Sequence, residues 1–194
     1  MKQVKNSVKT YWDWRSQNYG FDIDRYQEAA LKWEEAVTEL TDNGEGKTAL
    51  DIGTGTGQLA IYLARSGFET TGIDISGEMI RQAIQKSNEL NLNITFCVQD
   101  AEQTHFQKDT FDVVVSRNIL WTLPDPEKSV REWRRILKPG GKIIISDGFW
   151  QNHTWRHLHL LAIHALKSLF NPSAIIPVKF FTTYKDLQGK LPFY

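Results

Sequence analysis

The sequence predicts an α/β fold: a doubly wound, mostly parallel sheet with helices on both faces. Two observations predict it. First, short runs of β-branched and apolar residues alternate with segments of helical periodicity over the middle of the chain. Second, a glycine-rich turn follows the first of these runs, as it does where a strand leads into a helix. Strands that alternate with helices are joined by right-handed crossovers and therefore lie parallel.

Two helices are expected before the first strand. The first has aromatic, apolar and basic residues at helical spacing, namely Val8, Tyr11, Trp12, Arg15 and Tyr19, and Gly20 ends it. Asp24 then provides an N-cap for the second helix. The apolar face of the second helix is formed by Tyr26, Ala29, Ala30, Trp33, Val37 and Leu40. Residues 43–46, Asn-Gly-Glu-Gly, form a turn after it.

Five strands are expected after this turn, at residues 48–52, 70–73, 94–98, 111–115 and 142–146. Helices are expected between them, the first over residues 58–66. Ser76 caps the next helix, and Asp125 with Pro126 opens the third. The inward faces of these two helices are expected to consist of Met79, Ile80, Ala83, Ile84 and Leu90 and of Val130, Trp133, Ile136 and Leu137. Residues 138–141, Lys-Pro-Gly-Gly, are expected to end the third helix.

Composition and charge narrow the class of protein. The chain has 194 residues, 41% of them hydrophobic, with 23 basic and 23 acidic residues. This size suits one domain, and the zero net charge gives no reason to expect a nucleic-acid partner. Cys97 is the only cysteine, and the sequence has neither a signal peptide nor an apolar run of membrane-spanning length. We therefore expect a cytoplasmic protein with no membrane partner.

The glycine-rich turn, Asp51-Ile52-Gly53-Thr54-Gly55-Thr56-Gly57, is the first feature that indicates a ligand. Glycines let the backbone bend tightly and let a ligand approach closely. The helix start that follows offers unpaired N–H groups to a polar ligand. Counted from Gly55, the turn also fits the dinucleotide pattern G-x-G-x-x-A, with Ala60 in the last position, so an NAD-dependent oxidoreductase stays an alternative.

Acidic residues at three strand ends refine this interpretation. Asp74 ends the second strand, where a carboxylate can accept hydrogen bonds from both hydroxyls of a ribose. Asp51 precedes the glycines, where a carboxylate repels a pyrophosphate but stabilises a cationic amino acid group. Asp100-Ala101-Glu102 follows the third strand, where a side-chain acceptor and a backbone N–H can read the edge of an adenine.

In this order, the segments resemble a class I S-adenosylmethionine-dependent methyltransferase of the small-molecule group called type 11. The matching segments are residues 50–57, 72–76 with Met79, 99–102, 111–117 and 135–142. The resemblance covers residues 10–150 and implies a Rossmann-like fold. It also implies in-line methyl transfer to a small-molecule acceptor, with S-adenosyl-L-methionine as the cofactor.

The resemblance implies a set of cofactor-binding residues along the carboxyl edge of the sheet. The first helix is similar to the lid of this family, which adds Tyr11 and Tyr19. The remaining positions are Asp51, Gly53, Thr54, Gly55 and Gly57 at the turn, Asp74, Ile75 and Met79 after the second strand, Asp100, Ala101 and Glu102 after the third, and Ser116, Arg117 and Asn118 after the fourth.

The C-terminal part departs from the family pattern, which ends in an antiparallel hairpin. Only residues 178–184 are a candidate strand there. We expect a lid over residues 1–44, a cofactor-binding core over residues 45–170 and a C-terminal extension over residues 171–194, within one structural domain. Two explanations stay open: a truncated chain, or an open sheet edge that a second copy covers in a homodimer.

The acceptor site is the least defined by the sequence. Four residues are candidates for shaping it or for accepting a proton there: Trp121, Asp147, His153 and His157. His153 and His157 have the i, i+4 spacing of zinc ligands, but no carboxylate or cysteine accompanies them, and we expect no metal. Ser116-Arg117-Asn118-Ile119 also lacks the proline-rich motif of nucleic-acid amino-methyltransferases. A non-catalytic module that binds S-adenosylmethionine or oligomerises is the remaining alternative.

Overall fold

The computed structural model describes residues 2–19, 27–41 and 44–147. Its centre is a five-stranded parallel sheet in the order β3-β2-β1-β4-β5. The strands are β1 (Thr48–Ile52), β2 (Glu69–Asp74), β3 (Ile94–Val98), β4 (Phe111–Arg117) and β5 (Leu137–Ser146). The order reverses between β1 and β4, and in open α/β sheets a ligand binds where the order reverses. The predicted fold class is confirmed.

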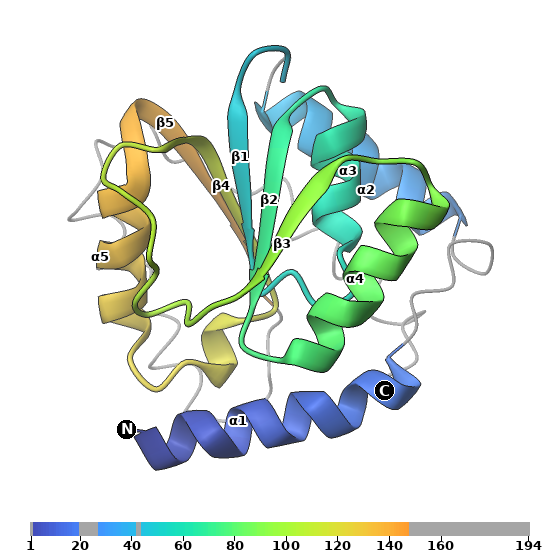
Figure 1. Cartoon of the computed structure of the whole chain (residues 1–194). Coiled ribbons are helices and arrows are strands. Elements are labelled where there is room, and N and C mark those ends of the chain that lie inside the picture. The colour runs from blue at the N-terminus through green and yellow to red at the C-terminus, as the bar shows by residue number, and fades with distance from the viewer. Residues whose placement is uncertain (1, 20–26, 42–43, 148–194) are drawn as a thin grey trace.

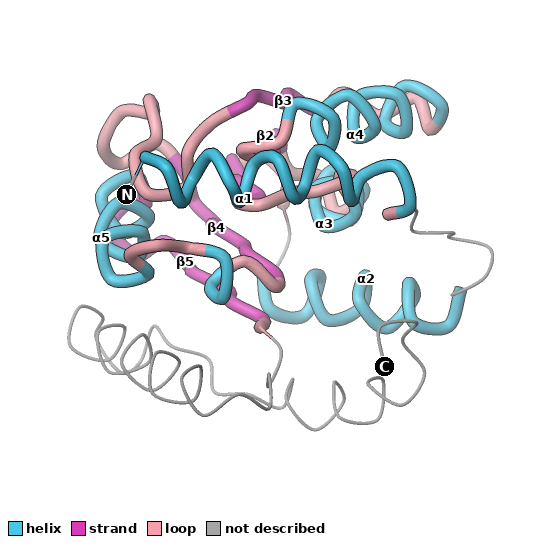
Figure 2. The backbone as a smooth tube through the Cα atoms, turned by 90° about the horizontal axis from the view of Figure 1, so that it is seen from below, coloured by secondary structure: helices cyan, strands magenta, loops and turns pink. Residues whose placement is uncertain are grey.

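Helices cover both faces of the sheet (Figure 1). On one face lies α5 (Pro126–Ile136); on the other lie α2 (Gln27–Thr41), α3 (Gln58–Arg65) and α4 (Gly77–Glu89). A further helix, α1 (Lys2–Arg15), continues into the short turn η1 (Ser16–Asn18) and runs across the carboxyl ends of the strands, as Figure 2 shows from below. A second short turn, η2 (Leu120–Thr122), follows β4. Of the two N-terminal helices, only α1 lies over this edge.

Two apolar clusters form the core because successive strand residues point to opposite faces. On the α5 side, Leu50, Ile52 and Val114 pack with Trp133, which is fully buried and donates a hydrogen bond from its indole N–H to the carbonyl of Ala101, at 2.9 Å. The other cluster joins α2 and α3 to the sheet and includes Trp33, Val37, Ala49, Leu59, Ile61, Tyr62, Leu63, Val113 and Val115. Of the face predicted for α2, Trp33 and Val37 are therefore confirmed, whereas Tyr26 lies outside the described residues.

The structure corrects two predictions. Residues 138–141 do not follow a helix that includes Leu137: α5 ends at Ile136, and β5 already begins at Leu137 and includes them. Leu137 pairs with Phe111, and the register then shifts before Val113, so this segment forms an irregular start of the strand. Ile84 was expected to face the core, but it is 42% exposed on α4. The Ser76 and Asp125 caps are confirmed, since their side chains accept hydrogen bonds from Met79 N and Lys128 N.

Candidate functional site

A cleft lies between α1 and the carboxyl ends of the strands. The space between its walls, including open solvent at its mouth, is about 730 Å³. Its lining combines glycine backbone, apolar and aromatic side chains, and both carboxylates and cations. The residues that line it are Lys5, Val8, Trp12, Tyr19, Gly53, Gly55, Ile73, Asp74, Ile75, Met79, Gln99, Asp100, Ala101, Arg117, Asn118, Ile119, Thr122, Leu123 and Pro124.

The glycine turn forms one wall of the cleft. Gly53, Gly55 and Gly57 all have positive φ, at 69°, 54° and 84°. A Cβ on Gly57 would lie 3.1 Å from the side chains of Ala83 and Phe96, so this glycine lets the turn pack against α4 and β3. A Cβ on Gly55 would meet only the Tyr19 ring, at 3.9 Å. Gly55 therefore leaves room in the cleft itself.

Asp51 lies beneath this turn and does not line the cleft. It is 2% exposed, and its Oδ2 accepts hydrogen bonds from the Thr54 hydroxyl at 2.7 Å and from Ala60 N at 3.0 Å. Because Ala60 is in the first turn of α3, the carboxylate satisfies one of the unpaired N–H groups at that helix start. Burial raises the pKa of Asp51 to about 6.

Asp74 is the carboxylate that lines the cleft beside the turn. Its Oδ2 accepts a hydrogen bond from Gly55 N at 3.0 Å, and its Oδ1 accepts one from Ser76 N at 2.9 Å. Burial also raises the pKa of Asp74 to about 6, although these backbone donors act against the increase. The carboxylate thus connects the end of β2 to the glycine turn and keeps an oxygen edge toward the cleft.

A second acidic group lies at the end of β3. Asp100 Oδ1 accepts a hydrogen bond from Glu102 N at 2.9 Å, which fixes a tight turn. Lys5 of α1 reaches this turn and pairs with Asp100 Oδ2 at 2.5 Å and with Glu102 Oε2 at 2.6 Å. Burial lowers the pKa of Lys5, but the two carboxylates outweigh it and raise that pKa above its ordinary value. Lys5 is therefore a firmly held ammonium group.

Arg117 is the last residue of β4 and lines the cleft. Its guanidinium lies 4.9 Å from the centre of the Trp33 ring, and its Nη2 donates a hydrogen bond to Gln58 Oε1 at 2.5 Å. Gln58 in turn donates to the Tyr62 hydroxyl at 2.9 Å. The positive charge of Arg117 also favours the ionised form of Asp51. This network fixes a cation between α2, α3 and the cleft.

The helix α1 closes the cleft from below. Val8 and Trp12 line the cleft from this helix, and Tyr19 lines it from just after η1. Asp13 Oδ1 accepts a hydrogen bond from the Ser76 hydroxyl at 2.6 Å, and Gln82 Nε2 donates to the carbonyl of Ser16 at 2.9 Å. Tyr11 was predicted to bind the cofactor, but it is 45% exposed and lies outside the cleft lining.

The structure therefore divides the predicted cofactor residues into two groups. Those that it brings together around the cleft are Tyr19, Gly53, Gly55, Asp74, Ile75, Met79, Asp100, Ala101, Arg117 and Asn118. Those that it places behind or outside the lining are Tyr11, Asp51, Thr54, Gly57, Glu102 and Ser116. Ser116, for example, is buried and donates its hydroxyl hydrogen bond to the carbonyl of Ile52, at 3.1 Å. The buried side chains of Asp51, Thr54 and Ser116 make hydrogen bonds that hold the loops carrying the lining residues.

The candidates for acceptor chemistry have different outcomes. Asp147 is 5% exposed, and its Oδ2 accepts a hydrogen bond from Leu120 N at 2.8 Å, so it holds the turn η2 in place. Trp121 belongs to η2, next to Thr122 and Leu123 of the lining, but its side chain is outside the description. His153 and His157 lie outside the described residues.

Sequence reasoning missed part of the lining. Lys5 belongs to no recognisable motif. The available signal was spacing: Lys5, Val8 and Trp12 lie at i, i+3 and i+7, on one face of a helix. Gln99 and the segment Ile119, Thr122, Leu123 and Pro124 were also missed. Within residues 2–19, 27–41 and 44–147, no group of three or more metal-ligating side chains occurs. The helices among them are also too short or too polar to cross a bilayer.

Comparison with known proteins agrees with this geometry. Residues 50–145 match the family described as methyltransferase domain. The central part of this chain is a methyltransferase domain. The resemblance seen in the sequence, the Rossmann-like fold and the assignment to a family that uses S-adenosylmethionine are confirmed.

Individual relatives share this domain. The ubiquinone biosynthesis O-methyltransferase of Coxiella burnetii is 34% identical over 102 residues, which are 53% of this chain and 44% of that protein. Phosphoethanolamine N-methyltransferase 1 of Arabidopsis thaliana is 35% identical over 103 residues, 53% of this chain and 21% of that protein. Among solved structures, the PH0226 protein of Pyrococcus horikoshii OT3 is 30% identical with a TM-score of 0.57, over 62% of this chain and 57% of that one. The chain thus spans about half the length, or less, of these relatives.

Proposed function

We propose that this methyltransferase domain transfers the methyl group of S-adenosylmethionine to a small-molecule acceptor. One observation carries the choice of cofactor. Two backbone N–H groups of the glycine turn and the start of α3, a region that can otherwise hold a phosphate, are already bonded to carboxylates: Gly55 N to Asp74, and Ala60 N to Asp51. A turn with two carboxylates repels a dinucleotide phosphate and attracts a cation. S-adenosylmethionine carries a sulfonium and an ammonium group, whereas NAD carries a pyrophosphate.

The residues of the cleft fit the parts of this cofactor. We assign the ribose hydroxyls to the carboxylate of Asp74 and the adenine edge to Asp100 with the backbone N–H of Ala101. Ile75 and Met79 supply apolar surface for the base between these two carboxylates. Gly55 leaves room for the methionine part, whereas Gly53 lets the Ile119 side chain pack against the turn. The cofactor, when bound, would supply an electrophilic methyl group: a lone pair of the acceptor would attack the methyl carbon in line with the carbon–sulfur bond, that bond would break with its electrons on sulfur, and S-adenosylhomocysteine would leave.

The remaining lining residues then position the acceptor. Arg117, Asn118 and Thr122 contribute polar groups at the β4 end, whereas Ile119 and Leu123 contribute apolar surface. Alignment of two reactants accounts for a large share of catalysis in such a displacement. We therefore assign binding of the methyl acceptor and exclusion of water to these residues and to α1. We assign no residue as the proton acceptor. Trp121, Asp147, His153 and His157 stay candidates for the acceptor site.

Calorimetric titration with S-adenosylhomocysteine tests the proposal. We expect S-adenosylhomocysteine to bind and NADH not to bind at millimolar concentration. Gly55→Ala should weaken this binding by about tenfold or more, which is about 1.4 kcal/mol, because the added methyl enters the cleft. Gly140→Ala is the matched control: Gly140 also has a positive φ, 79°, and open space around it, but it lies at the irregular start of β5.

Equal losses in the Gly55→Ala and Gly140→Ala variants would assign the effect to backbone strain. Binding of NADH in place of S-adenosylhomocysteine would overturn the proposal. Once binding is established, release of S-adenosylhomocysteine from S-adenosylmethionine can be measured over a panel of phenol and amine acceptors. Binding without turnover on any acceptor would instead support the non-catalytic alternative.

A further inference from the structure

Glu102 is a charged group that the proposed chemistry does not use. Its side chain is 0% exposed, and its Oε1 accepts a hydrogen bond from Asp125 N, just before α5, at 2.8 Å. Its Oε2 faces Lys5 Nζ at 2.6 Å. Removal of one partner from a buried ion pair leaves an uncompensated charge and is strongly destabilising. Lys5 is therefore the partner that compensates the buried carboxylate of Glu102.

The same ammonium group contacts the carboxylate that faces the cleft. Lys5 Nζ lies 2.5 Å from Asp100 Oδ2, while Asp100 Oδ1 accepts from Glu102 N. The backbone supports this arrangement, because Gln103 N donates to the carbonyl of Asp100 at 3.1 Å. Both oxygens of Asp100 are thus held, one by its own turn and the other by α1. An oxygen of an ionised carboxylate accepts more than one hydrogen bond, so Asp100 can accept a further donor from a ligand.

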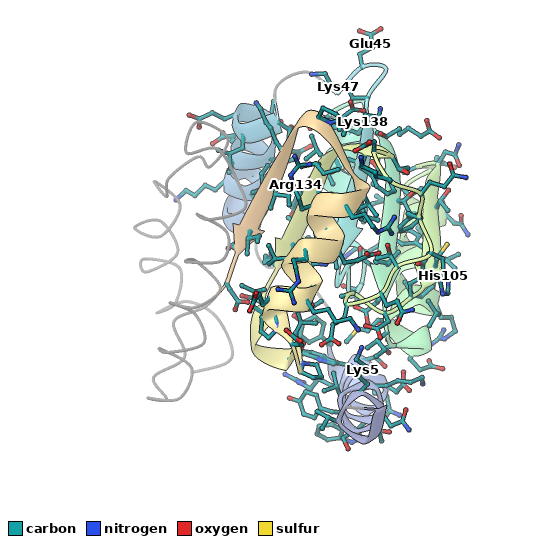
Figure 3. All side chains as sticks on the ribbon, turned by 90° about the vertical axis from the view of Figure 1, so that its left-hand side faces the viewer. Lys5, Glu45, Lys47, His105, Arg134 and Lys138 are labelled. Carbon is teal, nitrogen blue, oxygen red and sulfur yellow. The ribbon has the colours of Figure 1, made fainter. Side chains whose placement is uncertain are left out.

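Lys5 belongs to α1 and not to the sheet edge that it contacts. Figure 3 shows it on the helix that passes beneath the strands, at the opposite end of the molecule from Lys138. Val8 and Trp12, one and two turns further along α1, line the cleft. The far end of the helix contacts α4 through Asp13 and Ser76. The position of α1 over the cleft and the position of Asp100 are therefore coupled through one side chain.

We propose that Lys5 is a positioning residue for base recognition: its ion pairs with Glu102 and Asp100 hold Asp100 where it accepts the exocyclic amino group of adenine, only while α1 covers the cleft. This inference rests on the proposed function, since it takes the ligand to be an adenine nucleoside. Closure of α1 then contributes to selection of the base, because Lys5 holds the second oxygen of Asp100, Oδ2, only in the closed arrangement. A ligand that lacks the amino donor gains nothing from an oriented Asp100.

The test compares two ligands that differ in that donor, S-adenosylhomocysteine and its inosine counterpart, S-inosylhomocysteine. Wild-type protein should prefer the adenine ligand. Lys5→Met, which keeps the length of the side chain but removes its charge, should reduce the ratio of the two dissociation constants by about tenfold, the loss expected when a charged hydrogen-bond partner is no longer held in place. Lys5→Arg should keep most of the preference. Lys9→Met on the same helix, where Lys9 pairs with Asp13, should leave the ratio unchanged.

A variant that folds poorly would not end the test. Lys5→Met/Glu102→Gln removes the buried charge together with its partner, so it should recover stability while the ratio stays reduced. The inference would be overturned if Lys5→Met and Lys5→Met/Glu102→Gln both kept the wild-type ratio while their affinities for the two ligands fell in parallel. That result would show that Lys5 only supports the fold. Failure of wild-type protein to bind either ligand would instead overturn the proposed function.

Discussion

Asp51 and Asp74 lie at the ends of neighbouring strands, and burial raises the pKa of each to about 6. Their surroundings nevertheless give them different tasks. The carboxylate of Asp51 accepts hydrogen bonds from the Thr54 hydroxyl and from the backbone at the start of α3. Asp74 has the cleft on one side and two backbone donors on the other. At the scale of single residues, the site therefore combines a structural carboxylate with a binding carboxylate.

The raised pKa of Asp74 predicts a pH dependence of cofactor binding. Only the ionised carboxylate accepts hydrogen bonds from both ribose hydroxyls, and protonation becomes favourable below the pKa of about 6. The affinity for S-adenosylhomocysteine should therefore fall as the pH decreases from 7.5 through 6 to 5, by about tenfold per unit once the group is mostly protonated. Calorimetric titration over this range measures the effect.

Asp74→Asn is the control for this prediction. It should bind weakly at every pH and show only the shallower dependence that Asp51 contributes. A wild-type affinity that is constant between pH 5 and 7.5 would contradict the assignment of Asp74 to the ribose.

At the scale of secondary-structure elements, one side chain ties three strands together at the edge of the sheet opposite the cleft. Asp112 of β4 accepts hydrogen bonds from Thr48 N at 2.8 Å and from the Thr48 hydroxyl at 2.9 Å, both in β1. It also pairs with Lys138 of β5 at 2.8 Å. Burial raises the pKa of Asp112, but these partners outweigh it and lower that pKa below 3.8. The irregular start of β5 is anchored by this group.

Asp112→Ala should therefore destabilise the protein by about 2 kcal/mol at pH 7, through loss of two hydrogen bonds and a partly buried ion pair. A group with a lowered pKa contributes stability above its unfolded pKa and loses that contribution as the pH falls through its folded pKa. The difference from wild type should thus be complete at pH 7 and shrink below pH 3.8. Urea denaturation at several pH values measures it.

Lys108→Ala provides the comparison, because Lys108 is 74% exposed and, among the described residues, its ion pair is with the neighbouring Asp109. This variant should change the free energy of unfolding by less than about 0.5 kcal/mol. Equal stability of Asp112→Ala and wild type at pH 7 would show that the three-strand contact contributes nothing.

Helix and strand boundaries could be predicted from the sequence where a local hydrogen bond sets them. The helix α4 begins where Ser76 was expected to cap it, since this N-cap is a short-range hydrogen bond. The boundary between α5 and β5 was placed wrongly because Lys-Pro-Gly-Gly is typical of a helix end. In the fold, pairing of Leu137 with Phe111 draws the same residues into the sheet. The prediction that Ile84 faces the core was wrong for a related reason. Helical spacing defines a stripe of apolar residues along the helix, but the neighbouring elements decide how wide a part of that stripe is buried.

At the scale of the whole molecule, α1 differs from the other described helices in how it is attached. Its described contacts with the rest of the protein include ion pairs and hydrogen bonds at Lys5, Asp13 and Ser16, whereas the central strands β1 and β4 are mostly buried. Elements attached mainly by polar contacts open at lower free energy than core strands. We therefore expect α1 to be the part that moves when a ligand enters.

Hydrogen exchange measures this motion. Without ligand, amides of α1 should exchange faster than those of β1 and β4, and saturating S-adenosylhomocysteine should slow the exchange of α1. Amides of α5, which packs on a face of the sheet and not across the strand ends, serve as the internal control and should change little. Protection of α5 with no change in α1, in protein that binds the ligand, would contradict a covering role for α1.

The sequence by itself determined the parallel sheet, the glycine turn and the edge at which Asp74 and Asp100 meet, because the carboxyl ends of parallel strands converge on one edge. Only the tertiary structure decided which acidic groups reach the cleft. Asp51 points to the side of the sheet that carries α3, since alternate residues of β1 face opposite layers, and it is therefore enclosed. Lys5 is distant from Asp100 along the chain, and only the path of α1 across the strand ends brings the two charges together.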